Sequence, residues 1–237
     1  NMATKKKQFK NPFMTMKSHS SEIATDSNLK EAQDLHQKGE LEKAQGIYLQ
    51  VLEKDPQNAN VIYLLGLIAF QNSRHAEAIE LLTMAINIRS DDVTFHITCG
   101  DAFFEINQFT DALSCYNRVI YLDSKNVLAH YNKGRALKGL DQFEAAILSF
   151  DQALKLNPKL YEAHYNLGNL LKELKRFKQA LASYDQAIAF EPTLAVAHLN
   201  RGVVLRELNQ VEEALECFEE AIKLNPHYAE AFSNRGL

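Results

Sequence analysis

Residues 161–194 read YEAHYNLGNLLKELKRFKQALASYDQAIAFEPTL, and this pattern decides the fold because it returns along the chain every 34 residues, as between Pro158 and Pro192. Working outward from it, a proline or serine recurs at Pro56, Ser90, Ser124, Pro158, Pro192 and Pro226. Small residues recur on the same period at Gly66, Gly100, Gly134, Gly168, Gly202 and Gly236, and at Ala44, Ala78, Ala112, Ala146, Ala180 and Ala214. A fixed period of this length is typical of stacked repeats, which pack only against their neighbours.

Each repeat is predicted to form two antiparallel helices. In residues 161–194, the apolar positions of the first half fall three or four residues apart, which predicts a helix over about 161–174, and those of the second half predict another over about 177–190. Gly168 and Ala180 would let the two helices approach closely. The chain therefore divides into a basic tail at 1–24, six repeats, and the first helix of an incomplete seventh repeat at 229–237. The six repeats are 25–58, 59–92, 93–126, 127–160, 161–194 and 195–228.

The repeat resembles the tetratricopeptide repeat. The family's order of aromatic, Leu-Gly, large apolar, Ala, aromatic, Ala and Pro reads here as His164, Leu167-Gly168, Leu171, Ala180, Tyr184, Ala187 and Pro192. This resemblance implies an all-α, right-handed superhelical solenoid of antiparallel helix pairs. It also implies a non-catalytic scaffold whose concave groove binds an extended segment of a protein partner.

Candidate groove residues lie on the first helix of each repeat. Positions two, six, nine and thirteen share one face, because they differ by three or four residues. An asparagine recurs at position six, where its amide offers one acceptor and two donors to a peptide backbone. The candidate residues are the asparagines Asn132, Asn166, Asn200, Asn234 and Asn169, the tyrosines Tyr131 and Tyr165, and the basic residues Lys138, Lys172 and Arg206.

Each of these groups also has a structural interpretation. The asparagines would then be consensus residues that face water, and the tyrosines would pack in the core. The basic residues would solvate the helix surface, which we favour over attraction of an acidic peptide, because Glu173 and Glu207 follow directly. The asparagine series also resembles the substrate-binding arm of O-GlcNAc transferases. The alternative hypothesis is therefore a recruiting arm of a larger glycosyltransferase, with a catalytic domain beyond Leu237.

Composition excludes other classes of protein. With 46% hydrophobic and 24% charged residues, and no apolar run of about 20 residues, the chain is expected to be soluble and not to enter a membrane. Cys99, Cys115 and Cys217 form no paired framework, which favours a reducing, cytoplasmic location.

Residues 1–24 carry five lysines and one glutamate, a net charge of +4, whereas the whole chain has a net charge of −4. The repeats are therefore acidic, and we expect no nucleic-acid binding. A further hypothesis is self-association through the tail or the uncapped C-terminal helix.

Nothing in the pattern predicts chemistry. A histidine recurs every 34 residues, at His96, His130, His164 and His198. Each lies on a different first helix, too far from the next to share one metal ion, so we interpret the series as structural. The glycines follow the repeat and form no phosphate-binding loop. We therefore expect no enzyme activity, no cofactor and no metal site.

Overall fold

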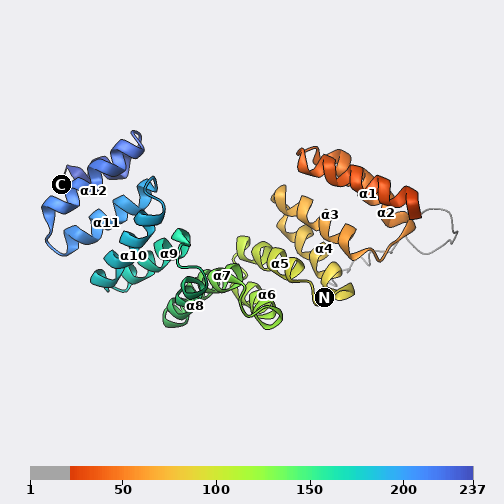
Figure 1. The fold of residues 1–237 in the computed structure, drawn as a ribbon, viewed down its shortest axis with the longest axis horizontal. Helices are drawn as coiled ribbons and strands as arrows, with labels where there is room; N and C mark the ends of the chain where they lie inside the picture. The colour runs from red at the N-terminus through yellow and green to blue at the C-terminus, as the bar shows by residue number, and fades with distance from the viewer. Residues whose placement is uncertain (1–21, 237) are drawn as a thin grey trace, which may run out of the picture. The chain divides into compact units, whose positions relative to one another are not determined.

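A computed structural model of the protein describes residues 22–236, and within this range the chain forms thirteen α-helices and no strand (Figure 1). The expected all-α fold is confirmed. Of the basic tail predicted at residues 1–24, residues 1–21 lie outside the described residues. Residues 22–24 belong to the first helix. The helices are α1 (Glu22–Gln37), α2 (Leu41–Lys54), α3 (Ala59–Gln71), α4 (His75–Ile88), α5 (Val93–Glu105), α6 (Phe109–Leu122), α7 (Val127–Gly139), α8 (Phe143–Leu156), α9 (Tyr161–Glu173), α10 (Phe177–Phe190), α11 (Ala195–Glu207), α12 (Val211–Leu224) and α13 (Ala229–Arg235).

The described residues form two compact units, an N-terminal unit that ends at Ala102 and a C-terminal unit that begins at Phe103. In the N-terminal unit α1 packs against α2 and α3 against α4. In the C-terminal unit the pairs are α7 with α8, α9 with α10 and α11 with α12, while α13 packs against α12. Each unit has its own apolar core, built around Tyr48 and Ile62 in the first and around Phe150, Tyr184 and Phe218 in the second.

Glycine at position eight sets the distance between the two helices of a repeat. A Cβ atom on Gly168 would lie 2.7 Å from Cε1 of Tyr184, and one on Gly202 would lie 2.6 Å from Cε1 of Phe218. Carbon atoms in protein interiors pack at about 3.5–4.0 Å. The aromatic side chain of the second helix therefore occupies the space that any larger residue at position eight would need, as the sequence predicts.

The turn between the two helices has a left-handed residue at position fifteen. In repeat five this residue is Lys175, with φ of 58°. The turn satisfies the last carbonyls of α9, because Lys175 N donates to Lys172 O at 2.9 Å and Arg176 N donates to Leu171 O at 2.8 Å. Asn and Asp tolerate this conformation better than Ser or Lys. The non-glycine members of the series are Ser73, Asn107, Asp141, Lys175 and Asn209.

Candidate functional site

The predicted asparagines of the C-terminal unit are already hydrogen-bonded within the protein. On α9, Asn166 Nδ2 donates to Tyr131 Oη on α7 at 2.9 Å and to the carbonyl of Glu162 at 2.9 Å. A backbone carbonyl only accepts, so the amide orientation of Asn166 is fixed by chemistry and both its N–H groups are used. Its Oδ1 accepts no hydrogen bond from the described residues. The tyrosine at position five thus bonds the asparagine at position six of the next repeat.

Asn200, on α11, forms the same kind of bond and two more. Its Nδ2 donates to Tyr165 Oη at 3.2 Å and to Asn169 Oδ1 at 3.2 Å, and its Oδ1 accepts from Lys172 Nζ at 2.7 Å. Asn169 Oδ1 also accepts from Tyr184 Oη at 2.8 Å. Asn200 therefore joins α9 and α11 through three side chains.

The two ends of the asparagine series differ from its middle. Asn132 is only 3% exposed, and its Oδ1 accepts a hydrogen bond from Arg135 at 3.4 Å. Asn234, on α13, donates to the carbonyl of Glu230 at 2.8 Å and accepts from Arg206 Nη1 at 2.9 Å. Burial leaves Asn132 poorly placed to meet a ligand, whereas Asn234 is half-buried.

The three basic residues have different partners. Lys138 pairs with Glu173 at 3.1 Å on the surface, whereas Lys172 and Arg206 donate to the neutral amide oxygens of Asn200 and Asn234. Desolvation by burial lowers the pKa of Lys172 despite the opposing influence of Glu230. Burial also raises the pKa of Tyr131, more than nearby Arg135 lowers it. The tyrosine is thus kept neutral and able to donate its hydroxyl proton.

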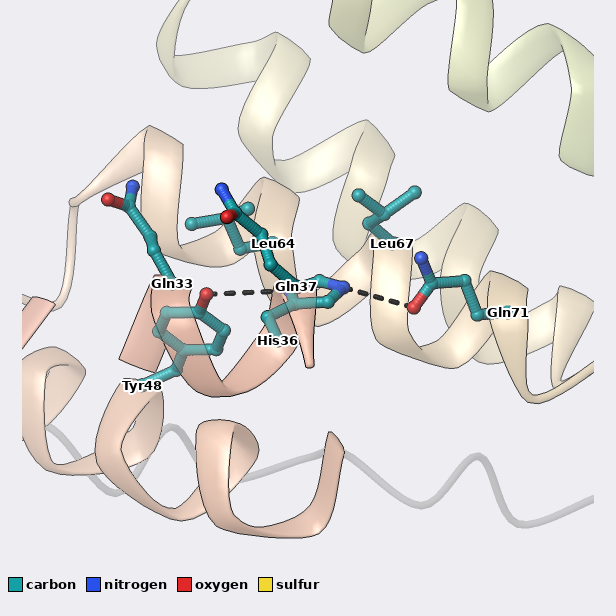
Figure 2. Close-up of a pocket in the computed structure, with 7 residues that line it drawn as sticks. All are labelled: Gln33, His36, Gln37, Tyr48, Leu64, Leu67 and Gln71. Carbon is teal, nitrogen blue, oxygen red and sulfur yellow. Dashed lines mark hydrogen bonds between the residues drawn. The ribbon is translucent and has the colours of Figure 1, made fainter. Parts of the chain in front are cut away.

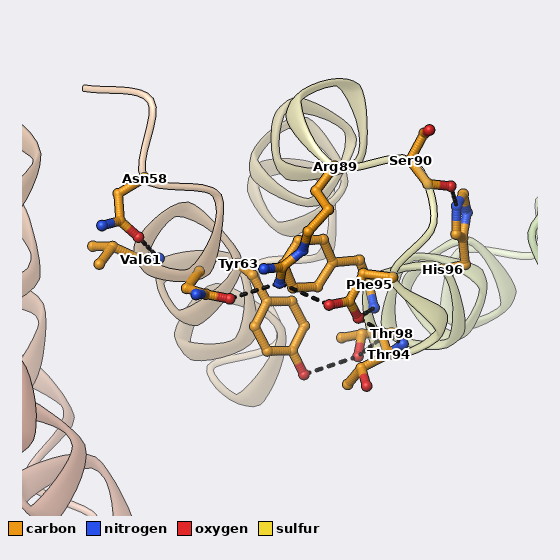
Figure 3. Close-up of polar contacts among 11 residues, drawn as sticks. Asn58, Val61, Tyr63, Arg89, Ser90, Thr94, Phe95, His96 and Thr98 are labelled. Atoms are coloured by element: carbon orange, nitrogen blue, oxygen red, sulfur yellow. Dashed lines mark hydrogen bonds and ion pairs between the residues drawn. The ribbon is translucent and has the colours of Figure 1, made fainter. Parts of the chain in front are cut away.

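The N-terminal unit has a variation of the same link (Figure 3). Tyr63 lies 3.3 Å from Thr98 Oγ1, and the Thr98 hydroxyl donates to the carbonyl of Thr94, so Tyr63 must be the donor. Tyr63 also stacks on Phe95, with ring centroids 4.7 Å apart. The guanidinium group of Arg89 lies over the Phe95 ring, with Cζ 4.5 Å from the ring centroid. A tyrosine at position five therefore links consecutive repeats in this unit as well.

A cavity of about 530 Å³ lies in the N-terminal unit between α1, α2 and α3 (Figure 2). His36 crosses it, with Nε2 3.0 Å from Gln71 Oε1 and Nδ1 3.4 Å from Tyr48 Oη. The sequence interpretation missed this cavity, because it looked for one residue type recurring every 34 residues, and most of the lining residues differ from repeat to repeat. The lining residues are Gln33, His36, Gln37, Tyr48, Leu64, Leu67 and Gln71.

The histidine series has a structural role. The Nε2 atom of each histidine donates to a backbone carbonyl six residues earlier, at the corner that ends the previous repeat, as for His96 and Ser90 in Figure 3. The distances are 2.9 Å for His96, 3.0 Å for His130, 2.9 Å for His164 and 3.0 Å for His198. Over residues 22–236, no group of three or more metal-ligating side chains is close enough to hold an ion.

Comparison with known families identifies the repeats. Sequence models of the tetratricopeptide repeat match residues 29–93, residues 161–194 and residues 195–228, and a further repeat model of the same kind matches residues 100–141 and 134–175. The chain belongs to the tetratricopeptide repeat family. No curated protein matches this tetratricopeptide repeat protein in a sequence search. Within residues 22–236 no helix has the length and apolar character needed to cross a bilayer.

Solved structures share the fold at low sequence identity. The crystal structure of MamA is 22% identical, with a TM-score of 0.65, over 70% of this chain and 96% of that one. YrrB, described as a tetratricopeptide repeat protein with an unusual peptide-binding site, is 20% identical with a TM-score of 0.65, over 80% and 98% of the two chains. PilW, a type IV pilus biogenesis factor, is 16% identical with a TM-score of 0.78, over 90% and 99%. At these identities the likeness shows the solenoid fold alone.

Proposed function

We propose that this chain is a non-catalytic protein-interaction scaffold, and that the first helices of the C-terminal unit hold an extended segment of a partner protein. The proposal rests on one observation, the bonds between a tyrosine of one repeat and an asparagine of the next. These bonds fix polar side chains in a regular series before any ligand arrives. A preorganised surface loses less entropy on binding.

The donor and acceptor atoms that remain free on this surface define which groups of a peptide it could bind. Tyr131 and Tyr165 accept from asparagine, so each hydroxyl proton remains available for a peptide carbonyl. The Oδ1 atom of Asn166 can accept from a peptide N–H. The amide donors of Asn166 and Asn200 are taken, which shifts the proposed donor role from the asparagines to the tyrosines.

The basic residues act mainly by orienting the amides in this proposal. Lys172 and Arg206 hold the oxygens of Asn200 and Asn234, and Lys138 is paired with Glu173. Each new neutral hydrogen bond contributes about 0.5–1.5 kcal/mol net, so a few of them give modest affinity. Binding would therefore be reversible and tolerant of the partner's side chains.

The test uses the full chain as bait to capture partners, followed by titration of the captured partner's binding segment. Tyr131→Phe/Tyr165→Phe removes both hydroxyls while keeping the rings. Tyr121→Phe is the matched control, because Tyr121 is 78% exposed on α6 and bonds no asparagine of the series. We expect the double variant to bind the segment several-fold more weakly than both the parent and the control. Equal affinities for all three proteins would remove the first-helix surface from the proposal.

Two other hypotheses stay predictions. The matched models and structures do not bear on a recruiting arm of a glycosyltransferase. Self-association through α13, whose Phe232 is 41% exposed, is tested by measuring the mass of the protein in solution with and without Phe232→Ser.

A further inference from the structure

We propose that the exposed face of α12 is a docking surface for the N-terminal segment of this chain, residues 1–21, supplied by the same copy or by a neighbouring one. This surface, called here the α12 face, consists of an apolar pair and three acidic residues. They are Val211, Leu215, Glu212, Glu216 and Glu219. The α12 face lies on a second helix, so it does not depend on the proposed use of the first helices.

The apolar pair of the α12 face occupies positions that are covered in the preceding repeat. Val211 and Leu215 lie at positions seventeen and twenty-one, four residues apart on one side of the helix, and are 51% and 38% exposed. On α10, Phe177 and Leu181 hold the same two positions and pack against the core of the C-terminal unit. On α12 these positions are therefore left as apolar surface that another segment can cover.

The same helix is strongly acidic. Its 14 residues include five glutamates and one lysine, a net charge of −4, whereas α4, the next most acidic second helix, has two glutamates and no lysine or arginine. The single lysine, Lys223, pairs with Glu220 at 3.1 Å. Glu212, Glu216 and Glu219 are exposed and form no ion pair with any residue from 22 to 236. They lie four and three residues apart, so they form one acidic stripe beside the apolar pair.

The N-terminal segment has the complementary composition. Residues 1–21, which lie outside the described residues, contain five lysines and no acidic residue, a side-chain charge of +5. Apolar residues stand directly before two of the lysines, as Phe9-Lys10 and Met16-Lys17. On the α12 face, each of the two exposed apolar residues is likewise followed directly by a glutamate. The segment can therefore cover apolar surface and pair opposite charges at the same time.

Both properties are needed for a specific contact. Ion pairs between exposed side chains are weak and are screened by salt, so charge alone would draw the lysines toward any acidic surface. Burial of Val211 and Leu215 is not screened, and it selects this part of α12. We therefore expect docking to depend on the apolar pair as well as on the glutamates.

The test is carbodiimide cross-linking of the full chain, which joins an amine to a carboxylate only where the two are in contact. Mass spectrometry of the peptides identifies the joined residues. We expect Lys10 and Lys17 to be joined to the glutamates of the α12 face at least about fivefold more often than to Asp111, an exposed carboxylate on α6, a helix without net charge. The yield should fall in about 1 M salt. Equal yields at Asp111, or no cross-link to the α12 face, would overturn the proposal.

Two variants isolate the apolar contribution. Val211→Ser/Leu215→Ser removes the apolar pair from exposed positions, so the fold and every charge are kept, and should lower the yield by at least about fivefold. Leu148→Ser is the matched control, because Leu148 is 70% exposed on α8, and it should leave the yield unchanged. An unchanged yield in the double variant would mean unspecific charge attraction and would refute the docking surface.

A charge reversal tests the pairing itself. Glu212→Lys/Glu216→Lys changes the α12 face, and Lys10→Glu/Lys17→Glu changes the segment. Either pair of substitutions alone should reduce the cross-links, and the combination should restore them between the same four positions, with the acidic and basic partners exchanged. Failure of the combined variant to restore them would contradict the proposal.

An equal mixture of isotope-labelled and unlabelled chains identifies which copy supplies the segment. Cross-linked peptides of mixed label show a neighbouring copy, and those of uniform label alone show the same copy. Either result supports the proposal, because both place residues 1–21 on the α12 face. Cross-links from Lys223 of one copy to the glutamates of the α12 face of another would show that a second α12 is the occupant, and would refute it.

Discussion

Replacing Gly168 with alanine tests whether the glycine series sets the helix spacing. The new Cβ would lie 2.7 Å from Cε1 and 2.8 Å from Cδ1 of Tyr184, about 1 Å closer than carbon atoms normally pack. The Tyr184 ring has no space to retreat, because it is fully buried and its hydroxyl donates to Asn169 at 2.8 Å. Overpacking of this kind costs about 1–3 kcal/mol. Alanine within a helix recovers about 1 kcal/mol of that through its higher propensity.

Gly46→Ala separates the two contributions. Gly46 lies inside α2 with no atom within 4 Å of its added Cβ, so alanine there should raise the free energy of unfolding by about 1 kcal/mol. The difference between the two variants is the packing cost, which we expect to be about 1–3 kcal/mol. Repeat arrays depart from two-state unfolding, so denaturant curves should be joined by amide exchange of α9 and α10. Equal stabilities for Gly168→Ala and Gly46→Ala would refute the spacing role.

A second background strengthens this test. In repeat two, Leu82 takes the place of the aromatic residue, and a Cβ on Gly66 would lie 3.0 Å from Leu82 Cγ, a slightly longer contact. Gly168→Ala should therefore cost less in a Tyr184→Leu background than in the parent. A double-mutant cycle measures this coupling directly. Additive effects would show that the clash lies elsewhere.

Three further predictions concern Tyr184, Lys175 and Asn200. Burial raises the pKa of Tyr184, so the unfolded chain ionises first, and the stability this tyrosine contributes is present below about pH 10 and lost as the pH rises. Tyr184→Phe should cost about 1 kcal/mol at pH 8 but reduce the loss of stability as the pH rises above about 10, measured by denaturant unfolding. Lys175→Gly should raise stability by about 0.5–1 kcal/mol in thermal unfolding, since Lys175 has φ of 58°. Asn200→Ala should lower stability by about 1–3 kcal/mol, whereas the exposed control Asn117→Ala should change it little, and equal effects would contradict the role of Asn200 as a link.

The sequence predicts the helix pairs well because their cause is local and repeated. The small residues Gly168 and Ala180 recur where two backbones approach, and α9 and α10 span nearly the ranges expected from the apolar spacing. The short turn follows from the same period. Its left-handed residue was not predicted, because Lys175 gives no sign of that conformation, although Asn107 and Asn209 at the same position do.

The contacts of the candidate site could not be predicted from the sequence, because they depend on which side chains of neighbouring repeats meet. The asparagine series was readable from the sequence, but its hydrogen bonds to Tyr131 and Tyr165 depend on how far one first helix is displaced along the next. The side chains that line the cavity do not follow the repeat. Gln33 and Leu67 occupy the same position of successive repeats with different chemistry, so a search for regularity passes over them.

The tyrosine–asparagine bonds also connect stability with binding. Each one joins residues 35 apart, which places it between neighbouring repeats, and nearest-neighbour contacts of this kind hold a repeat array together. A ligand that takes the N–H groups of Asn166 or Asn200 must break such a bond, whereas one that uses the Tyr131 hydroxyl proton or the Asn166 Oδ1 leaves it intact. Ligands of the second kind add their hydrogen bonds to the native state and should raise the stability of the C-terminal unit. Asn166 and Asn200 therefore contribute to the cohesion of the array, and under the proposed function a partner would use the atoms that these bonds leave free.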